Sequence, residues 1–257
     1  MKTYTIHLIR HGMTEGNKVG RYVGSTDASL FADGIDEIEK LKQKYEYRSP
    51  KLFFSSPMKR CIETLDLIYG GEKEIDVHTV DGLKECNLGD FEGKTAEELI
   101  DNPAYTDWVA HGAAPPNGES NKDFSVRVCT AFVQTVKEIL KQGVTESVIC
   151  AHGGVIMTIL AVYGLPERKM TDYMANNGRG FTIRVTPSVW MRSGMVEVVS
   201  DFPLGSSSEP DNSINPVKES KSNPFGAVKD DTDEQRDVFW ANVDELELAK
   251  QDENSEE

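Results

Sequence analysis

Three short segments of the sequence contain the residue types that bind and transfer phosphate. Arg10 and His11 lie in RHGMTEGN, Arg60 ends the segment SSPMKR, and His152 lies in AHGG. The planar fork of an arginine matches the oxygens of a phosphoryl group, and a neutral imidazole is a nucleophile near pH 7 without a separate base. Such a cluster would repel itself without an anion, so it points to phosphoryl transfer.

Each of these segments follows a short apolar run that is typical of a buried strand. The runs cover residues 4–9, 51–54 and 147–151, and helical patterns follow them. This alternation predicts a three-layer α/β/α fold with a mainly parallel sheet. Because the carboxyl ends of parallel strands share one edge of the sheet, we expect the three segments to meet there.

The other expected elements continue the alternation. A glycine beside each histidine is expected to let the backbone approach a phosphate closely, and the helix after Gly154 offers N–H groups to an anion. We expect helices at 35–45, from Pro57 to about Tyr69, in one or two pieces over 95–111, at 119–141 and from Gly154 to about Tyr163, and strands at 75–80, 181–186 and 194–200.

Five ordered motifs run through about residues 3 to 200. They are Arg10-His11-Gly12 with Thr14, Glu15 and Asn17; GSTDASL from Gly24 to Leu30, followed by Gly34; Ser56-Pro57 with Arg60 and Thr64; LKECNLGDFEG from Leu83 to Gly93; and Gly118-Glu119-Ser120 with the later His152-Gly153. Together they resemble the histidine phosphatase superfamily, whose fold is phosphoglycerate mutase-like. One RHG triplet alone is weak evidence, whereas five motifs in the family's order are strong evidence.

The resemblance implies a role for each matched residue. His11 corresponds to the residue that is phosphorylated in the family, and Glu85 corresponds to its proton donor. Cys86 is a departure from the residue types expected after that acid, and we expect it to affect packing and not the mechanism. The residues implied to hold the phosphoryl group are Arg10, Arg60, His152 with its neighbour Gly153, and, in an assisting role, Asn17.

Several of these residues also have ordinary structural interpretations. Arg60 is, in the alternative, a surface helix residue paired with Glu63, and Asn17 is simply a helix residue. Tyr105 and Trp108 are equally suited to lining a substrate pocket and to core packing. The segment from Leu83 to Gly93 also contains Asp90 and Glu92, which suit a solvated loop, and His7 suits packing within its strand.

Three functions fit the motifs. A phosphatase hydrolyses a small phosphorylated metabolite, a phosphoglycerate mutase moves the phosphoryl group to another hydroxyl, and a non-catalytic module only binds phosphate. The presence of His11 and Glu85 argues against the third. Residues 85–121 contain eight carboxylates, one lysine and no arginine, which disfavours a second anionic group and favours a phosphatase with a neutral or cationic leaving group. The run PPNGES at 115–120 resembles the α-ribazole phosphatase branch, which also contains broad-range phosphatases.

Composition narrows the choice of partners and cofactors. The net charge of −15 falls mostly after Asp201, where 16 acidic and 5 basic residues carry −11 and leave −4 for the first 200. Neither part has the basic patch that a nucleic-acid binder needs, so we expect no nucleic-acid partner. We expect no metal or cofactor, because the five histidines lack zinc-ligand spacing, and no membrane segment or signal peptide. Four scattered cysteines indicate a reduced, cytoplasmic setting. Oligomeric state is not indicated.

The chain is expected to divide near residue 202. Residues 1–202 form the predicted catalytic domain, and residues 203–257 form an acidic tail that is mostly disordered, because its composition is poor in apolar residues. Residues 203–230 are expected to be a linker. Phe239, Val243 and Leu246 repeat at helical spacing, so a short amphipathic helix is expected at 233–250.

Overall fold

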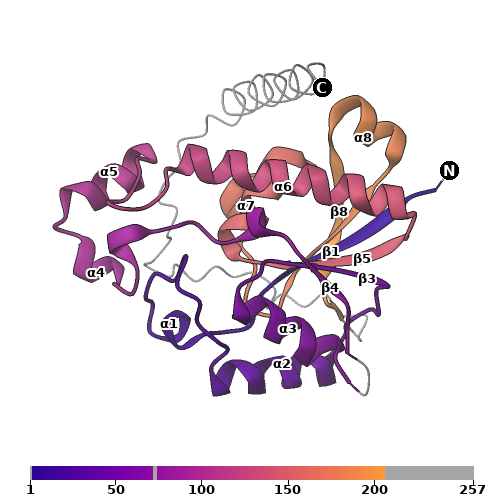
Figure 1. Ribbon diagram of the computed structural model, residues 1–257, viewed down its shortest axis with the longest axis horizontal. Coiled ribbons are helices and arrows are strands. Elements are labelled where there is room, and N and C mark those ends of the chain that lie inside the picture. Colours follow the sequence, from indigo (N-terminus) through magenta and orange to yellow (C-terminus); the bar gives the residue numbers. More distant parts are fainter. Residues whose placement is uncertain (1, 72–73, 206–257) are drawn as a thin grey trace, which may run out of the picture.

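A sheet of seven strands forms the centre of the computed structural model, which describes residues 2–71 and 74–205 (Figure 1). Within those residues the strand order is β4-β3-β5-β1-β7-β8-β6, and the pairing directions leave only β7 antiparallel to the rest. The predicted mainly parallel sheet is confirmed. The strands are β1 (Tyr4–Arg10), β3 (Leu52–Ser55), β4 (Val77–Thr79), β5 (Glu146–Ala151), β6 (Gly164–Leu165), β7 (Gly180–Val185) and β8 (Val196–Phe202).

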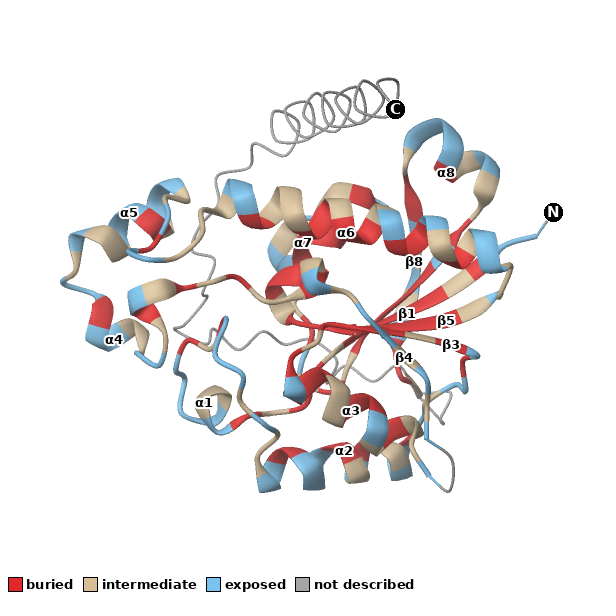
Figure 2. Ribbon diagram, viewed as in Figure 1, coloured by how far each residue is buried: buried red, intermediate tan, exposed pale blue. Residues whose placement is uncertain are grey.

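Helices cover both faces of this sheet, as expected for three layers (Figure 1). Successive strand residues point to opposite faces, so Leu8 packs in the cluster that includes α6 and α7, whereas Ile9 packs in the cluster that includes α2 and α3. The sheet is therefore buried on both sides, and β5 is buried over nearly its whole length (Figure 2). These helices are α2 (Ala32–Lys44), α3 (Lys59–Tyr69), α6 (Asn121–Gln142) and α7 (Gly153–Tyr163).

The shorter elements lie mostly in the connections. Residues 95–111 form two helices, and Pro103 begins the second, because proline is accepted at the first helical position. The two helices are α4 (Ala96–Leu99) and α5 (Pro103–His111). The others are α1 (Glu15–Lys18), α8 (Pro187–Ser193), the 3-10 helices η1 (Asp81–Leu83), η2 (Gly89–Phe91) and η3 (Met170–Tyr173), and the strand pair β2 (Tyr45–Glu46) and β9 (Leu204–Gly205).

Two expected elements need correction. Helix α3 begins at Lys59 with Met58 as its N-cap, so Pro57 precedes the helix and does not lie in its first turn. Helix α8 was not expected, although Pro187 at its start and the left-handed Gly194 at its end are the usual signals of a helix. The tail was expected to begin at residue 203, but residues 203–205 are ordered in the fold, because β9 pairs with β2. The rest of the expected disordered tail and the amphipathic helix expected at 233–250 lie outside the described residues.

The predicted domain boundary is tested by truncation. A chain ending at Gly205 contains every strand of the sheet, whereas a chain ending at Gly194 lacks β8 with its buried Val196 and Phe202. We expect the first to match the full chain in melting temperature and in turnover of small phosphomonoesters, and the second to fail to fold, because it exposes the edge of β7. Thermal melts and phosphate-release assays check this. A large loss in the chain ending at Gly205 contradicts the boundary.

Candidate active site

The three phosphate-binding segments meet at the carboxyl edge of the sheet. Strand β5 pairs in parallel with β1 on one side and β3 on the other. Beyond the strand ends the pairing continues, because the His11 backbone N–H donates to the Ala151 carbonyl at 3.0 Å and the Ser56 N–H donates to the Cys150 carbonyl at 2.9 Å. Adjacent strands thus bring together the four residues that were expected to converge, Arg10, His11, Arg60 and His152.

His11 is positioned with a single free ring nitrogen. Its side chain is buried, and Nδ1 lies 2.6 Å from the Gly12 carbonyl oxygen. A carbonyl only accepts, so Nδ1 carries the proton and Nε2 keeps its lone pair. Burial, followed by the charges of Arg60 and Arg10, holds the pKa of the imidazole well below its ordinary 6.5. His11 is therefore neutral, as a nucleophile must be.

His152 and Arg60 form a second buried pair beside it. The rings of His11 and His152 have centroids 5.1 Å apart. Arg60 Nε donates to His152 Nδ1 at 3.3 Å, and His152 Nε2 lies 2.8 Å from the Ser56 hydroxyl. The pKa of His152 is held well below its usual range by burial and by the Arg60 charge. Both side chains are fully buried.

Arg60 is not the surface residue of the alternative interpretation. Its two terminal nitrogens donate to the carbonyls of Thr26 and Gly24 at 2.7 and 2.8 Å. Glu63, the partner considered for it, accepts the Leu30 backbone N–H instead, at 2.7 Å. Arg60 lies in the first turn of α3, which begins shortly after β3 ends at Ser55, and its side chain is fully buried.

Arg10 lies against the start of α7. One terminal nitrogen donates to the Ala175 carbonyl at 2.8 Å, while Nε is buried and has no hydrogen-bond partner among the residues that the structure describes. A Cβ added at Gly153 would lie 3.5 Å from the guanidinium carbon, an ordinary contact. Burial lowers the pKa of Arg10, but arginine stays charged in proteins. A buried, charged N–H without an acceptor is costly, so this group is suited to an anion.

Glu85 reaches the same cluster from the loop after η1. Its carboxylate accepts the backbone N–H groups of Cys86 at 3.0 Å and Gly154 at 3.1 Å. Burial raises the pKa of this carboxyl, and the two N–H donors and the arginine charges oppose the increase. Glu85 therefore holds its proton to a higher pH than an exposed glutamate. Cys86 packs in the core, as expected.

Asn17 and Gly12, in the same motif as His11, also make structural contacts. The Asn17 amide oxygen accepts the Thr14 backbone N–H at 3.1 Å and completes the capping box of α1. Because that N–H only donates, the amide orientation is set and its NH₂ group faces away from the cap. A Cβ at Gly12 would lie 2.6 Å from Ile38 Cδ1 and 3.0 Å from Leu30 Cδ2. A larger residue at this position would therefore have to displace the side chains of Ile38 on α2 and Leu30, and the expected approach of the Gly12 backbone to a phosphate stays a prediction.

Glu92 has a role that the sequence did not indicate. Its carboxylate accepts from the backbone N–H groups of Gly24 and Ser25 and from the hydroxyls of Ser25 and Thr26, at 2.7 to 3.2 Å. These residues include the two whose carbonyls bind Arg60. Glu92 therefore fixes the loop that orients Arg60, and it is not a solvated loop acid. In the sequence, the only signal for this role of Glu92 was its position in the matched motif from Leu83 to Gly93.

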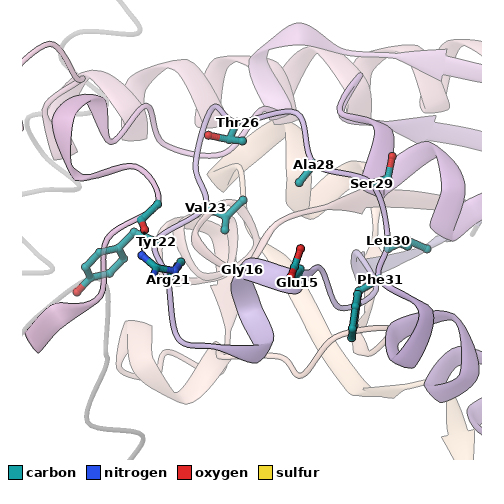
Figure 3. A pocket seen from close by; sticks show the side chains of 11 residues that line it. Glu15, Gly16, Arg21, Tyr22, Val23, Thr26, Ala28, Ser29, Leu30 and Phe31 are labelled. Atoms are coloured by element: carbon teal, nitrogen blue, oxygen red, sulfur yellow. Dashed lines mark hydrogen bonds between the residues drawn. The ribbon is translucent and has the colours of Figure 1, made fainter. Parts of the chain in front are cut away.

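Two cavities flank the 24–31 loop in the described part of the chain. The first, of about 430 Å³, is lined by residues that include Glu15, Arg21 and Tyr22 (Figure 3). The second, of about 770 Å³, is lined by residues that include Glu85 and Arg127.

Trp108 is buried in the core against Tyr22, while the hydroxyl groups of Tyr105 and Tyr22 form a hydrogen bond of 2.7 Å. Of the two interpretations for Trp108, core packing is therefore correct.

Other features of the described residues concern metals, membranes and cysteines. Among residues 2–71 and 74–205 there is no group of three or more His, Cys, Asp and Glu that could hold a metal ion. None of the described helices combines the length and apolar character required to cross a bilayer. The four cysteines are free and buried.

The fold and the cluster of two arginines and two neutral histidines define an α/β enzyme of phosphate esters. Residues 6–193 match the description "Histidine phosphatase superfamily (branch 1)", and the chain belongs to that superfamily. The chain is therefore an enzyme of the histidine phosphatase type, and the resemblance noted in the sequence is confirmed.

Relatives and solved structures agree with this assignment. The adenosylcobalamin/α-ribazole phosphatase of Escherichia coli K12 is 29% identical, over 66% of this chain and 85% of its own. A broad-specificity phosphatase of Saccharomyces cerevisiae is 31% identical over 60% of this chain and 68% of its own. The crystal structure of an α-ribazole phosphatase from Shigella flexneri has a TM-score of 0.64 and 26% identity, covering 76% of this chain and 95% of that one. Phosphoglycerate mutases also occur among the relatives.

The neutral state of His11 is directly measurable. We expect its imidazole to remain in the neutral Nδ1–H form at pH 6.5, the ordinary pKa of histidine, because burial and two arginine charges oppose protonation. Nitrogen-15 NMR of the labelled histidines distinguishes the two tautomers and the charged form. A midpoint near 6.5 for His11 contradicts the expected shift.

Proposed function

We propose that this enzyme hydrolyses small phosphomonoesters through a phosphohistidine at His11. The observation that carries the proposal is the buried cluster in which His11 Nε2 is free beside Arg10, Arg60 and His152. A dianionic phosphoryl group satisfies the unpartnered Nε–H of Arg10 and the charge of both arginines. The N-terminus of α7 lies alongside and also favours negative charge.

In the first step His11 Nε2 attacks phosphorus. The new P–N bond forms as the P–O bond to the leaving group breaks, and that bond's electron pair goes to the leaving oxygen. Glu85, whose pKa is raised by burial, gives its proton to this oxygen, so the leaving group departs as a neutral alcohol. Arg10 and Arg60 neutralise the charge on the transferred oxygens. Neutral His152, whose Nδ1 accepts from Arg60, donates its Nε2–H, and Asn17 NH₂ and the Gly153 backbone assist.

In the second step water releases the phosphate. The Glu85 carboxylate, now unprotonated, accepts a proton from the attacking water, and a new P–O bond forms as the P–N bond breaks. The electron pair of that bond returns to Nε2, which restores neutral His11 and protonated Glu85. No metal is needed for either step, because the arginines supply the positive charge.

The basic residues around the site favour hydrolysis over mutase chemistry. A mutase must also hold a carboxylate and, in its intermediate, a second phosphate. Lys18 is paired with Asp33, and Arg21 with Glu98. Lys84 is paired with Asp81 in the cavity beside Glu85. These pairings, together with the eight carboxylates of residues 85–121, support a leaving group that is neutral or cationic.

The α-ribazole 5′-phosphate ester is the first substrate to test. Relatives named as α-ribazole phosphatases in Escherichia coli and Shigella flexneri support this choice, as does the PPNGES run. Its leaving group is uncharged at the ribose hydroxyl. The cytoplasmic setting expected from the unpaired cysteines stays a prediction.

A trapping experiment tests the covalent intermediate. Brief mixing with phosphorus-32-labelled substrate followed by an alkaline quench should leave a base-stable, acid-labile label on the protein, because phosphohistidine has that stability. His11→Ala should abolish the label, whereas His111→Ala, an exposed histidine on α5, should retain it. Label that persists in His11→Ala would show that another residue is the nucleophile.

A product assay separates the two activities. We expect inorganic phosphate from α-ribazole 5′-phosphate and other simple monoesters, with negligible conversion of 3- to 2-phosphoglycerate even when 2,3-bisphosphoglycerate is supplied. Like charges in a partly dry site repel by several kcal/mol at an effective dielectric of about 20, so a second anion is disfavoured. Phosphate release and a coupled enolase assay measure the two outcomes. Fast interconversion with little phosphate release would overturn the phosphatase assignment.

A further inference from the structure

We infer that Arg127 is the positioning residue for the proton donor Glu85, an inference that rests on the proposed function. Arg127 lies on α6, far from Glu85 in sequence, and lines the cavity that Glu85 also lines. Among the described residues, the hydrogen bonds of its guanidinium do not reach Arg10, His11, Arg60 or His152. It binds the backbone of the loop that carries Glu85.

All five N–H donors of Arg127 are used in this arrangement. Three bind loop carbonyls: Nη1 donates to Gly82 at 3.0 Å and to Lys84 at 2.9 Å, and Nη2 to Glu85 at 3.4 Å. The other two bind the carboxylate of Glu119, from Nε at 3.3 Å and Nη2 at 2.5 Å. An arginine has five donors in a rigid fork, so this side chain has none left for a substrate anion.

Glu119 extends the same support to the other side of Glu85. Its carboxylate accepts the Asn87 backbone N–H at 2.9 Å, and its own N–H donates to the Asn87 carbonyl at 2.9 Å. The loop is thus held before, at and after Glu85 by two residues near the start of α6. Among residues 2–71 and 74–205, the Glu85 carboxylate is hydrogen-bonded only to the backbone N–H groups of its neighbour Cys86 and of Gly154.

The packing of the loop on α6 is close as well. A Cβ added at Gly82 would lie 2.5 Å from the Cβ of Ala131 and 3.3 Å from the carbonyl of Arg127. Residues 84–88 belong to no helix or strand, so they have no regular ladder of hydrogen bonds to set the position of Glu85. The hydrogen bonds from Arg127 replace that ladder and set the position of the Glu85 backbone. This position matters for the rate, because a displacement of about 1 Å at a catalytic group costs roughly 10²-fold.

The prediction is a loss that depends on the leaving group. Arg127→Met should slow hydrolysis of glycerol 2-phosphate by about 10- to 100-fold, because its alkoxide needs the proton. It should slow p-nitrophenyl phosphate by less than about threefold, because nitrophenolate leaves without one. Glu85→Gln, measured in parallel, should show the same selectivity with a loss of roughly 10²- to 10⁴-fold on glycerol 2-phosphate. Inhibition by inorganic phosphate should not change in Arg127→Met.

The controls separate positioning from general damage. Arg184→Met removes an exposed arginine paired with Glu197 and should leave both substrates unaffected. In the Glu85→Gln, Arg127→Met double variant the loss should match that of Glu85→Gln, since a misplaced loop costs nothing once the proton is absent. If Arg127→Met does not fold, Glu119→Gln answers the same question, with a smaller but equally selective loss.

The outcomes distinguish the two proposals. The positioning role is overturned if Arg127→Met loses activity equally on both substrates, or if the losses multiply in the double variant. The proposed mechanism still stands in that case, provided that the loss in Glu85→Gln depends on the leaving group. Equal losses on both substrates in Glu85→Gln overturn the proton-donor role itself and the inference with it. Selective losses in both variants, with a non-additive double variant, support the positioning role.

Discussion

The burial of two arginines beside two neutral histidines is the constraint on which the rest of this structure depends. Removing a guanidinium from water costs on the order of several kcal/mol unless acceptors replace the water. Arg60 meets that cost with two loop carbonyls and His152, while Arg10 has one carbonyl and leaves Nε without a partner. The same two charges help to hold the pKa values of His11 and His152 well below their ordinary range.

The parallel strand pairing and the hydrogen bonds of Glu92 make that burial possible. Parallel pairing of β5 with β1 and β3 brings the charged segments to one edge. Glu92 then gathers the donors of residues 24–26, which turns their carbonyls toward Arg60. Loops in such folds carry the function. Here the loops at 24–26 and 82–87 are fixed by charged side chains from other parts of the chain, which gives these irregular segments the rigidity that a site requires.

Opposite charges are also divided between the two sides of the site. The phosphate side has arginines with buried, directed donors, whereas the cations around the cavities are paired with carboxylates or, like Arg127, bound to the loop. Glu85 lies at the boundary, where burial raises its pKa against the influence of the arginines. This division of charge supports the proposed hydrolysis of an ester whose alcohol is uncharged or cationic.

Local signals in the sequence were enough to determine the architecture and the chemical core of the site. Apolar runs such as 4–9 and 147–151 are short-range patterns, and histidine or arginine immediately after each strand end must lie at the sheet edge once the strands are parallel. The sequence therefore predicted the mainly parallel three-layer fold and the meeting of His11, Arg60 and His152. It missed α8 and placed Pro57 inside a helix, because helix ends depend on the capping of one or two residues.

Only the tertiary structure decided which groups hold these residues in place. Gly12 is constrained by Ile38 and Leu30, Glu92 by the 24–26 loop, and Arg127 by the carbonyls around Glu85. Each of these contacts joins segments 18 to 68 positions apart, so no local periodicity or motif records it. The tautomer of His11, the charge states of both histidines and the commitment of the basic residues likewise follow from burial and from distant neighbours, which are properties of the packed chain.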